Sequence, residues 1–175
     1  MILEKLQSIT TFIFDVDGIL TNGNVLVNEQ GEQLRSFNIK DGYAIQLAVK
    51  RGFRVAIISG AKSNGVELRL KGLGIQNIFL GIDSKIEVYN SFKNIYKLCD
   101  EDIIYMGDDI PDLSIMKVVG IPVSCADAVE EVKATAHYVS SKNGGEGCVR
   151  DIIEKVLKVQ GKWYDALPSA NDGKF

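Results

Sequence analysis

The chain has 175 residues, of which 46% are hydrophobic, and its formal net charge at pH 7 is −3. This length and this share of apolar residues suit one domain with a sizeable core. The slightly negative charge, without a long run of Lys or Arg, argues against a nucleic-acid-binding protein and leaves a small molecule as the expected partner. Three widely spaced cysteines argue against a disulfide framework or a zinc site, and no segment resembles a secretory signal or a membrane span, so we expect a cytoplasmic protein.

Short apolar runs alternate with longer amphipathic segments along the chain, which is the pattern of a parallel sheet flanked by helices. Most of these runs are continuously apolar, as strands covered on both faces are. The expected strands span residues 10–16, 54–60, 77–81, 102–107, 121–126 and 137–141. We therefore predict an α/β fold with a doubly wound parallel sheet, in a domain of residues 1–162 without a separate cap domain.

One segment breaks this rhythm directly after the first strand. Within residues 24–42, two β-prone runs flank NEQGEQ, which indicates a β-hairpin rather than a crossover helix. Ligands of open α/β sheets bind outside the carboxyl ends of the strands, where such a hairpin would cover the crevice. We therefore predict a hairpin flap at about residues 24–38.

Helical patterns occupy three longer segments. Residues 41–52 end in a glycine suited to a helix C-terminus, and residues 84–99 open with Ser84 and Glu87 in capping-box spacing. The expected apolar face of residues 84–99 consists of Val88, Phe92, Ile95, Tyr96 and Cys99. In the last helix the apolar repeat before Gly161 consists of Val149, Ile152, Ile153, Val156 and Leu157. Beyond it we expect a C-terminal tail, residues 163–175, in which ALPSANDGKF has no regular structure.

Two carboxylates end the first strand. The stretch FIFDVDGILTN, residues 12–22, places Asp15 and Asp17 two residues apart after an apolar run. Residues two apart in a strand point to the same face, so these side chains would converge on one small volume. Because two buried negative charges repel each other unless a positive charge lies near them, the sequence predicts a cation at this position.

Further polar residues follow the later strands. Ser59 follows the second strand, Lys85 comes after the third, and GDDIPD, residues 107–112, follows the fourth. This set offers carboxylate oxygens and no histidine, which suits Mg²⁺ far better than zinc. Lys85, Ser59 and strand-end amides together match a phosphate dianion. One carboxylate could then attack phosphorus, while the other protonates the leaving oxygen and later activates water.

The motifs DVDGILT, IISG, Lys85 and GDDIPD resemble, in order and spacing, the four motifs of the haloacid dehalogenase superfamily. The resemblance implies that Asp15 is a nucleophile that forms an aspartyl phosphate and that Asp17 is the acid/base. It also implies a phosphate site formed by Gly18, Ser59, Gly60 and Lys85. An Asp at position 17 is the usual choice of the phosphatases in that superfamily, which favours hydrolysis.

The same resemblance implies a Mg²⁺ site. Its ligands would be Asp15, the main-chain carbonyl of Asp17, and Asp108. Asp109 and Asp112 would not bind the metal themselves but would help to orient these ligands.

A more specific resemblance is to capless phosphatases of 3-deoxy-D-manno-octulosonate (KDO) 8-phosphate, carried by DVDGILTNG, FNIKDGYAI, LRLKGLGI, GDDIPDL, NGGEGCVRDI and VQGKW. It implies hydrolysis of KDO 8-phosphate, a precursor of bacterial lipopolysaccharide, by a homotetramer. In that assembly the hairpin packs between chains, and neighbouring chains help to close the active site. Lys62 and Arg69 are candidate substrate contacts, with a solvated helix face as the alternative for both.

One departure keeps the substrate open. After Ser59 and Gly60, the octulosonate phosphatases usually carry Arg and relatives acting on the nine-carbon KDN 9-phosphate carry Glu, whereas this chain has Ala61. KDN 9-phosphate and sialic acid 9-phosphate are therefore alternative substrates.

Two other classes of protein share parts of this pattern. A phosphorylation-dependent receiver module would carry its phosphorylated Asp after a middle strand rather than after the first. A non-catalytic scaffold for oligomerisation or binding is the second alternative, and the intact set of motif residues argues against it.

Overall fold

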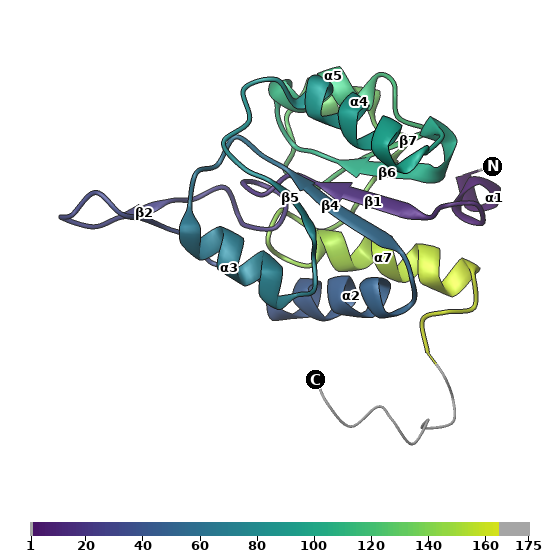
Figure 1. The fold of residues 1–175 in the computed structure, drawn as a ribbon, viewed down its shortest axis with the longest axis horizontal. Coiled ribbons are helices and arrows are strands. Elements are labelled where there is room, and N and C mark those ends of the chain that lie inside the picture. The colour runs from purple at the N-terminus through teal and green to yellow at the C-terminus, as the bar shows by residue number, and fades with distance from the viewer. Residues whose placement is uncertain (1, 165–175) are drawn as a thin grey trace.

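The computed structural model describes residues 2–164, which form a six-stranded sheet in the order β5-β4-β1-β6-β7-β8 (Figure 1). Every neighbouring pair of these strands is parallel. The strands are β1 (Thr11–Phe14), β4 (Arg54–Ile58), β5 (Asn77–Phe79), β6 (Ile103–Met106), β7 (Ile121–Ser124) and β8 (Tyr138–Val139). The prediction of an α/β fold with a doubly wound sheet is confirmed, and all six expected strands are present in shortened form.

Helices cover both faces of this sheet. In Figure 1, α2, α3 and α7 lie below it, and α4 and α5 lie above it. The helices are α1 (Ile2–Leu6), α2 (Ile39–Lys50), α3 (Asn64–Gly72), α4 (Lys85–Tyr96), α5 (Leu113–Met116), α6 (Glu130–Thr135) and α7 (Cys148–Val159), with 3-10 turns η1 (Asp100–Asp102) and η2 (Ile110–Asp112). Because both faces are covered, every residue of β1, β6 and β7 is buried. None of the described helices is long and apolar enough to cross a membrane.

The expected helix patterns hold to different degrees. The five apolar residues predicted for the last helix are all buried in α7, so that pattern is confirmed. In α4, however, the buried residues are Lys85, Tyr89 and Phe92, whereas Ile95 is 72% exposed. Of the expected apolar face only Phe92 is fully buried, and Tyr96 and Cys99 are exposed. The prediction of this buried face was wrong because α4 turns the side chains of Lys85 and Tyr89 inward, where Lys85 pairs with Asp15 and Tyr89 donates to Asp100.

The expected capping box at the start of α4 is also wrong. Ser84 is the N-cap residue, but its side chain makes no capping hydrogen bond.

The hairpin after β1 is confirmed. It consists of β2 (Leu26–Val27) and β3 (Gln33–Leu34), paired antiparallel, and it projects beyond the end of the sheet (Figure 1). Both strands are exposed, with Leu26 at 69%, Val27 at 59% and Leu34 at 51% exposure. A two-stranded hairpin has little stability of its own in water, so this exposed apolar surface is unusual for an isolated chain.

At the other end of the described chain, Trp163 packs edge-on against Tyr43 of α2, with ring centroids 6.3 Å apart. The division into a domain of residues 1–162 and a tail therefore stays a prediction. The expectation for ALPSANDGKF lies outside the described residues.

Candidate active site

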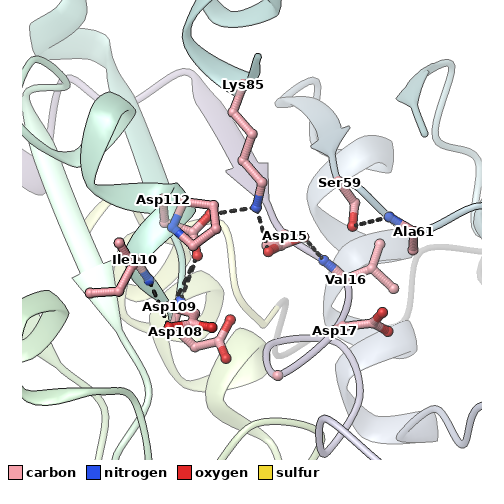
Figure 2. Close-up of polar contacts among 12 residues, drawn as sticks. Asp15, Val16, Asp17, Ser59, Ala61, Lys85, Asp108, Asp109, Ile110 and Asp112 are labelled. Atoms are coloured by element: carbon pink, nitrogen blue, oxygen red, sulfur yellow. Dashed lines mark hydrogen bonds and ion pairs between the residues drawn. The ribbon is translucent and has the colours of Figure 1, made fainter. Parts of the chain in front are cut away.

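The polar residues expected at the strand ends lie together at one edge of the sheet. Asp15 follows β1, Ser59 follows β4, and Asp108 comes shortly after β6, which are neighbouring parallel strands. These residues line one cavity of about 760 Å³, and Lys85 enters it from the first turn of α4 (Figure 2). The strand order thus brings together four groups that are far apart in the sequence.

Lys85 bridges two carboxylates in this cavity. Its Nζ donates to Oδ2 of Asp15 at 2.5 Å and to Oδ1 of Asp112 at 2.6 Å, as Figure 2 shows. Burial opposes the charge of the ammonium, but the two carboxylates outweigh it and raise the pKa of Lys85. Lys85 is therefore a positive charge shared by Asp15 and Asp112, held at a helix N-terminus where a cation is otherwise unfavourable.

Asp15 is fixed by two donors. Its Oδ1 accepts a hydrogen bond from the amide of Val16 at 2.6 Å, and its Oδ2 accepts the one from Lys85. Burial and the charge of Asp112 raise the pKa of Asp15, and Lys85 counteracts them. The carboxylate is thus held in one orientation at the end of the central strand.

Asp112 uses both of its oxygens within the protein. Oδ1 accepts from Lys85 and from the hydroxyl of Tyr105 at 2.5 Å. Oδ2 accepts from the amides of Asp108 at 2.9 Å and Asp109 at 3.2 Å. With four donors on a fully buried side chain, Asp112 is engaged in holding Lys85 and the 107–112 loop.

The acidic residues fit a divalent cation. Asp15, Asp108 and Asp112 each offer an oxygen, and these atoms lie within 4.8 Å of one another. Oδ1 of Asp108 is buried without a hydrogen-bond partner. Burial and the charges of its acidic neighbours raise the pKa of Asp108 to about 8. An unused carboxylate oxygen among like charges is what a Mg²⁺ ligand requires, and since Asp112 is already engaged, Asp15 and Asp108 are the carboxylates left for it.

Glycine permits the close approach of Asp108 to the 15–18 segment. Gly18 has φ +82°, and a Cβ at this position would lie 1.9 Å from Oδ2 of Asp108. Gly60 lines the same cavity, and Oγ of Ser59 accepts a hydrogen bond from the amide of Ala61 at 3.3 Å. The hydroxyl of Ser59 also hydrogen-bonds to Asp15 and so opposes the rise in the pKa of that carboxylate, and it can donate to an oxyanion bound beside Asp15.

Asp17 lines the same cavity but pairs with a different cation. Nε of Arg35 donates to its Oδ1 at 2.6 Å, and Nη2 donates to its Oδ2 at 3.0 Å. In the structure Asp15 and Asp17 therefore have different protein partners, Lys85 and Arg35, in two separate ion pairs. The reason is that β1 ends at Phe14, so the alternation of a strand no longer applies at Asp17. The sequence analysis did not identify Arg35 as a site residue. Its position as a cation in the predicted flap, which follows the two carboxylates, could have indicated this role.

The two candidate substrate contacts lie in different places. Lys62 lines a second cavity of about 850 Å³, between the hairpin and the loop after β4. Arg69 instead packs against α2, where a Cβ on Gly42 would lie 2.6 Å from its Nη2. The structure therefore places Lys62 beside the site and does not bring Arg69 to the site of its own chain.

Comparisons with known proteins agree with this geometry. The family model for haloacid dehalogenase-like hydrolases matches residues 81–152. The chain is 36% identical to the 3-deoxy-D-manno-octulosonate 8-phosphate phosphatase KdsC of Escherichia coli K12, over 94% of this chain and 88% of that protein. It is 34% identical to the KdsC protein of Yersinia pestis, over 92% of this chain and 86% of that protein.

Solved structures of such phosphatases are also similar. The Yersinia pestis enzyme has a TM-score of 0.90 at 34% identity, covering 92% of this chain and 87% of that one. The Moraxella catarrhalis enzyme, in complex with magnesium ion, phosphate ion and KDO, has a TM-score of 0.89 at 34% identity, covering 93% of both chains. The chain therefore belongs to the haloacid dehalogenase superfamily and, within it, to the subfamily of KDO 8-phosphate phosphatase-like hydrolases.

Proposed function

We propose that this protein is a Mg²⁺-dependent phosphatase that hydrolyses KDO 8-phosphate to KDO and inorganic phosphate. The main support is the position of Asp15 at the end of the central strand, held by Lys85 in a cavity whose carboxylates fit a divalent cation. The chain is similar over most of its length to enzymes that bear this name. The magnesium, phosphate and KDO bound to the Moraxella catarrhalis protein correspond to the cofactor and the two products of this reaction.

In the first half of the reaction, a carboxylate oxygen of Asp15 attacks phosphorus, and the bond from phosphorus to the sugar oxygen breaks. Asp17 donates a proton to that departing oxygen, which leaves as an alcohol. Lys85 and Ser59 bind the phosphoryl oxygens as they move. Asp15 and Asp108 would hold Mg²⁺, which would supply positive charge to offset that of the phosphoryl group.

In the second half, a water molecule attacks phosphorus of the aspartyl phosphate, and Asp17 takes its proton. The bond between phosphorus and Asp15 breaks, which releases phosphate and restores the carboxylate. Lys85 donates to the regenerated carboxylate of Asp15 and so opposes the effect of burial on its charge.

The test measures phosphate release from KDO 8-phosphate, KDN 9-phosphate, a sialic acid 9-phosphate and hexose phosphates, with Mg²⁺ and with chelator. We expect Mg²⁺-dependent release with strong preference for KDO 8-phosphate. Asp15→Asn should lower turnover by at least about 10³-fold, because an amide cannot form the acyl phosphate. Its thermal melting should show that the variant remains folded, and near-full turnover by it would contradict the role of Asp15.

A nine-carbon acid is the second candidate substrate. The side chain that lines the cavity after Gly60 is Ala61, and it offers no charge to a sugar acid. Preference for KDN 9-phosphate or sialic acid 9-phosphate in the same panel would make position 61 a specificity determinant. Absence of release from every compound would instead favour a non-catalytic scaffold.

We also propose a homotetramer in the cytoplasm. The exposed apolar residues Leu26, Val27 and Leu34 of the hairpin support association with other copies. The cavity beside the hairpin is open in the single chain, and neighbouring chains would limit the access of water to it.

A further inference from the structure

Arg35 differs from the rest of the hairpin in where its side chain lies. Its hairpin neighbours Gln33 and Leu34 are exposed, whereas the Arg35 side chain is only 5% exposed. Nη1 donates to the carbonyl of Gln33 at 3.3 Å, so the guanidinium is also tied to its own strand. Arg35 is thus a fixed extension of the hairpin toward the active site.

The contact of Arg35 with Asp17 has the geometry of a paired fork. Two nitrogens meet two oxygens at 2.6 and 3.0 Å, which restricts both the position and the rotation of the carboxylate. Within residues 2–164, these are the two side-chain hydrogen bonds that hold the Asp17 carboxylate. The Asp17 side chain is 38% exposed and lies beyond the end of β1, so neither packing nor the strand fixes its orientation.

The Arg35–Asp17 ion pair lies where two cavities meet. The second cavity, of about 850 Å³, lies between residues 31–35 of the hairpin and residues 60–65 after β4. It shares Asp17, Gly60 and Ala61 with the cavity that holds Asp15. A leaving oxygen that receives a proton from Asp17 therefore lies at this junction, with the remainder of the leaving group on the hairpin side.

We propose that Arg35 is a positioning residue, which holds Oδ1 of Asp17 through its shorter hydrogen bond while Oδ2 carries the proton that it delivers to the leaving oxygen, and which so links the hairpin to the chemical step. This inference rests on the proposed acid/base role of Asp17. Arg35 acts through Asp17 and has no need to contact the substrate. Substitution of Arg35 should therefore lower kcat/KM more for a leaving group that needs a proton than for one that leaves without it.

The leaving group distinguishes positioning from general damage to the site. A sugar alkoxide is strongly basic and requires protonation as it leaves, whereas p-nitrophenolate leaves readily without a proton. The ratio kcat/KM reports the steps up to the formation of the aspartyl phosphate, so the later attack of water does not obscure the comparison.

The experiment compares kcat/KM of Arg35→Gln and the wild type on KDO 8-phosphate and on p-nitrophenyl phosphate. We expect a loss of about 10²-fold on KDO 8-phosphate and of less than about threefold on p-nitrophenyl phosphate. Asp17→Asn should show the same pattern with a larger loss. The matched control is Arg54→Gln, because Arg54 stacks on Tyr96 at the opposite end of β4, and both of its values should stay within about twofold of the wild type.

The double variant Asp17→Asn/Arg35→Gln tests whether Arg35 acts through Asp17. On KDO 8-phosphate it should be no slower than Asp17→Asn alone, because a positioning residue has nothing left to position. A further loss in the double variant would show that Arg35 contacts the substrate, and it would overturn the proposal. Equal losses on the two substrates, or no loss in Arg35→Gln, would overturn it as well.

Two results separate failure of this inference from failure of the proposed function. A wild-type protein without Mg²⁺-dependent release of phosphate would overturn both. An active wild type with any of the contrary patterns above would overturn only the role of Arg35. If Arg35→Gln melts well below the wild type, Arg35→Lys keeps the charge but loses the fork, and it should show the same substrate pattern in weaker form.

Discussion

The acidic residues of the site differ in what offsets their charge. Asp15 and Asp112 share Lys85, and Asp17 has Arg35, but one buried oxygen of Asp108 accepts no hydrogen bond. Burial and like charges then make ionisation of Asp108 unfavourable, which raises its pKa to about 8. At the scale of single residues, a bound cation therefore matters most to Asp108.

This difference predicts how the metal-free protein responds to pH. Because the pKa of Asp108 rises from 3.8 to about 8 on folding, its contribution to stability is complete below about pH 4 and is lost as pH rises through about 8. In chelator, we expect the melting temperature to fall as pH rises from about 5 to 8, and added Mg²⁺ to restore it. Asp108→Asn should flatten this dependence and abolish the effect of Mg²⁺.

The control for this experiment is Glu87→Gln, which neutralises an exposed carboxylate on α4 that is not among the acidic groups acting on Asp108. It should retain both the fall with pH and the recovery with Mg²⁺. An Asp108→Asn protein that keeps the wild-type dependence on pH would contradict the assignment.

At the scale of elements, the start of α7 depends on a carboxylate from α2. The N-cap residue Gly147 has no side chain, and Asp41 takes its place, accepting from the amides of Gly147 at 3.2 Å and Arg150 at 2.7 Å. The loop before α7 also packs against the active-site segment, since a Cβ on Gly144 would lie 1.9 Å from the carbonyl oxygen of Gly18. Asp41 therefore supports the start of α7 and, through the loop before that helix, the active-site segment at Gly18.

The contact predicts the effect of two substitutions. Asp41→Ala should lower the free energy of unfolding by about 2 kcal/mol, because two amides at a partly buried helix start lose their acceptor. Asp41→Asn keeps one carbonyl oxygen and should cost less. Unfolding in urea measures both changes, and equal losses in the two variants would show that the hydrogen bonds are not the cause.

At the scale of the whole molecule, the projecting hairpin and the open cavity beside it point to association. Leu26→Lys places a charge in the exposed apolar strand β2, so we expect the proposed tetramer to dissociate into smaller species, as measured by light scattering. The matched control is Ile95→Lys, because Ile95 is about as exposed as Leu26 and belongs to α4, which lies away from the hairpin in Figure 1. A wild-type protein that is monomeric at assay concentration would contradict the tetramer.

Much of the fold could be predicted because its signals are local. Continuous apolar runs identified the six strands, and the repeat in residues 148–159 identified the buried face of α7. The buried face of α4 could not be found this way, because Lys85 and Tyr89 count as polar or amphipathic until their partners are known. Tyr89 donates to Asp100 and Lys85 to Asp15, and both contacts depend on tertiary structure.

The sequence by itself determined the chemistry of this protein. The residue types and spacing of its motifs were enough to predict a phosphatase of the haloacid dehalogenase type. The reason is that carboxylates, Lys and Ser at strand ends have the same chemical properties whichever residues the fold brings next to them. Only the tertiary structure decided which charge pairs with which: Lys85 with Asp15 and Asp112, and Arg35 with Asp17. Ion pairs between residues 18 to 70 positions apart depend on strand order and on the path of the hairpin, and neither is encoded in local spacing.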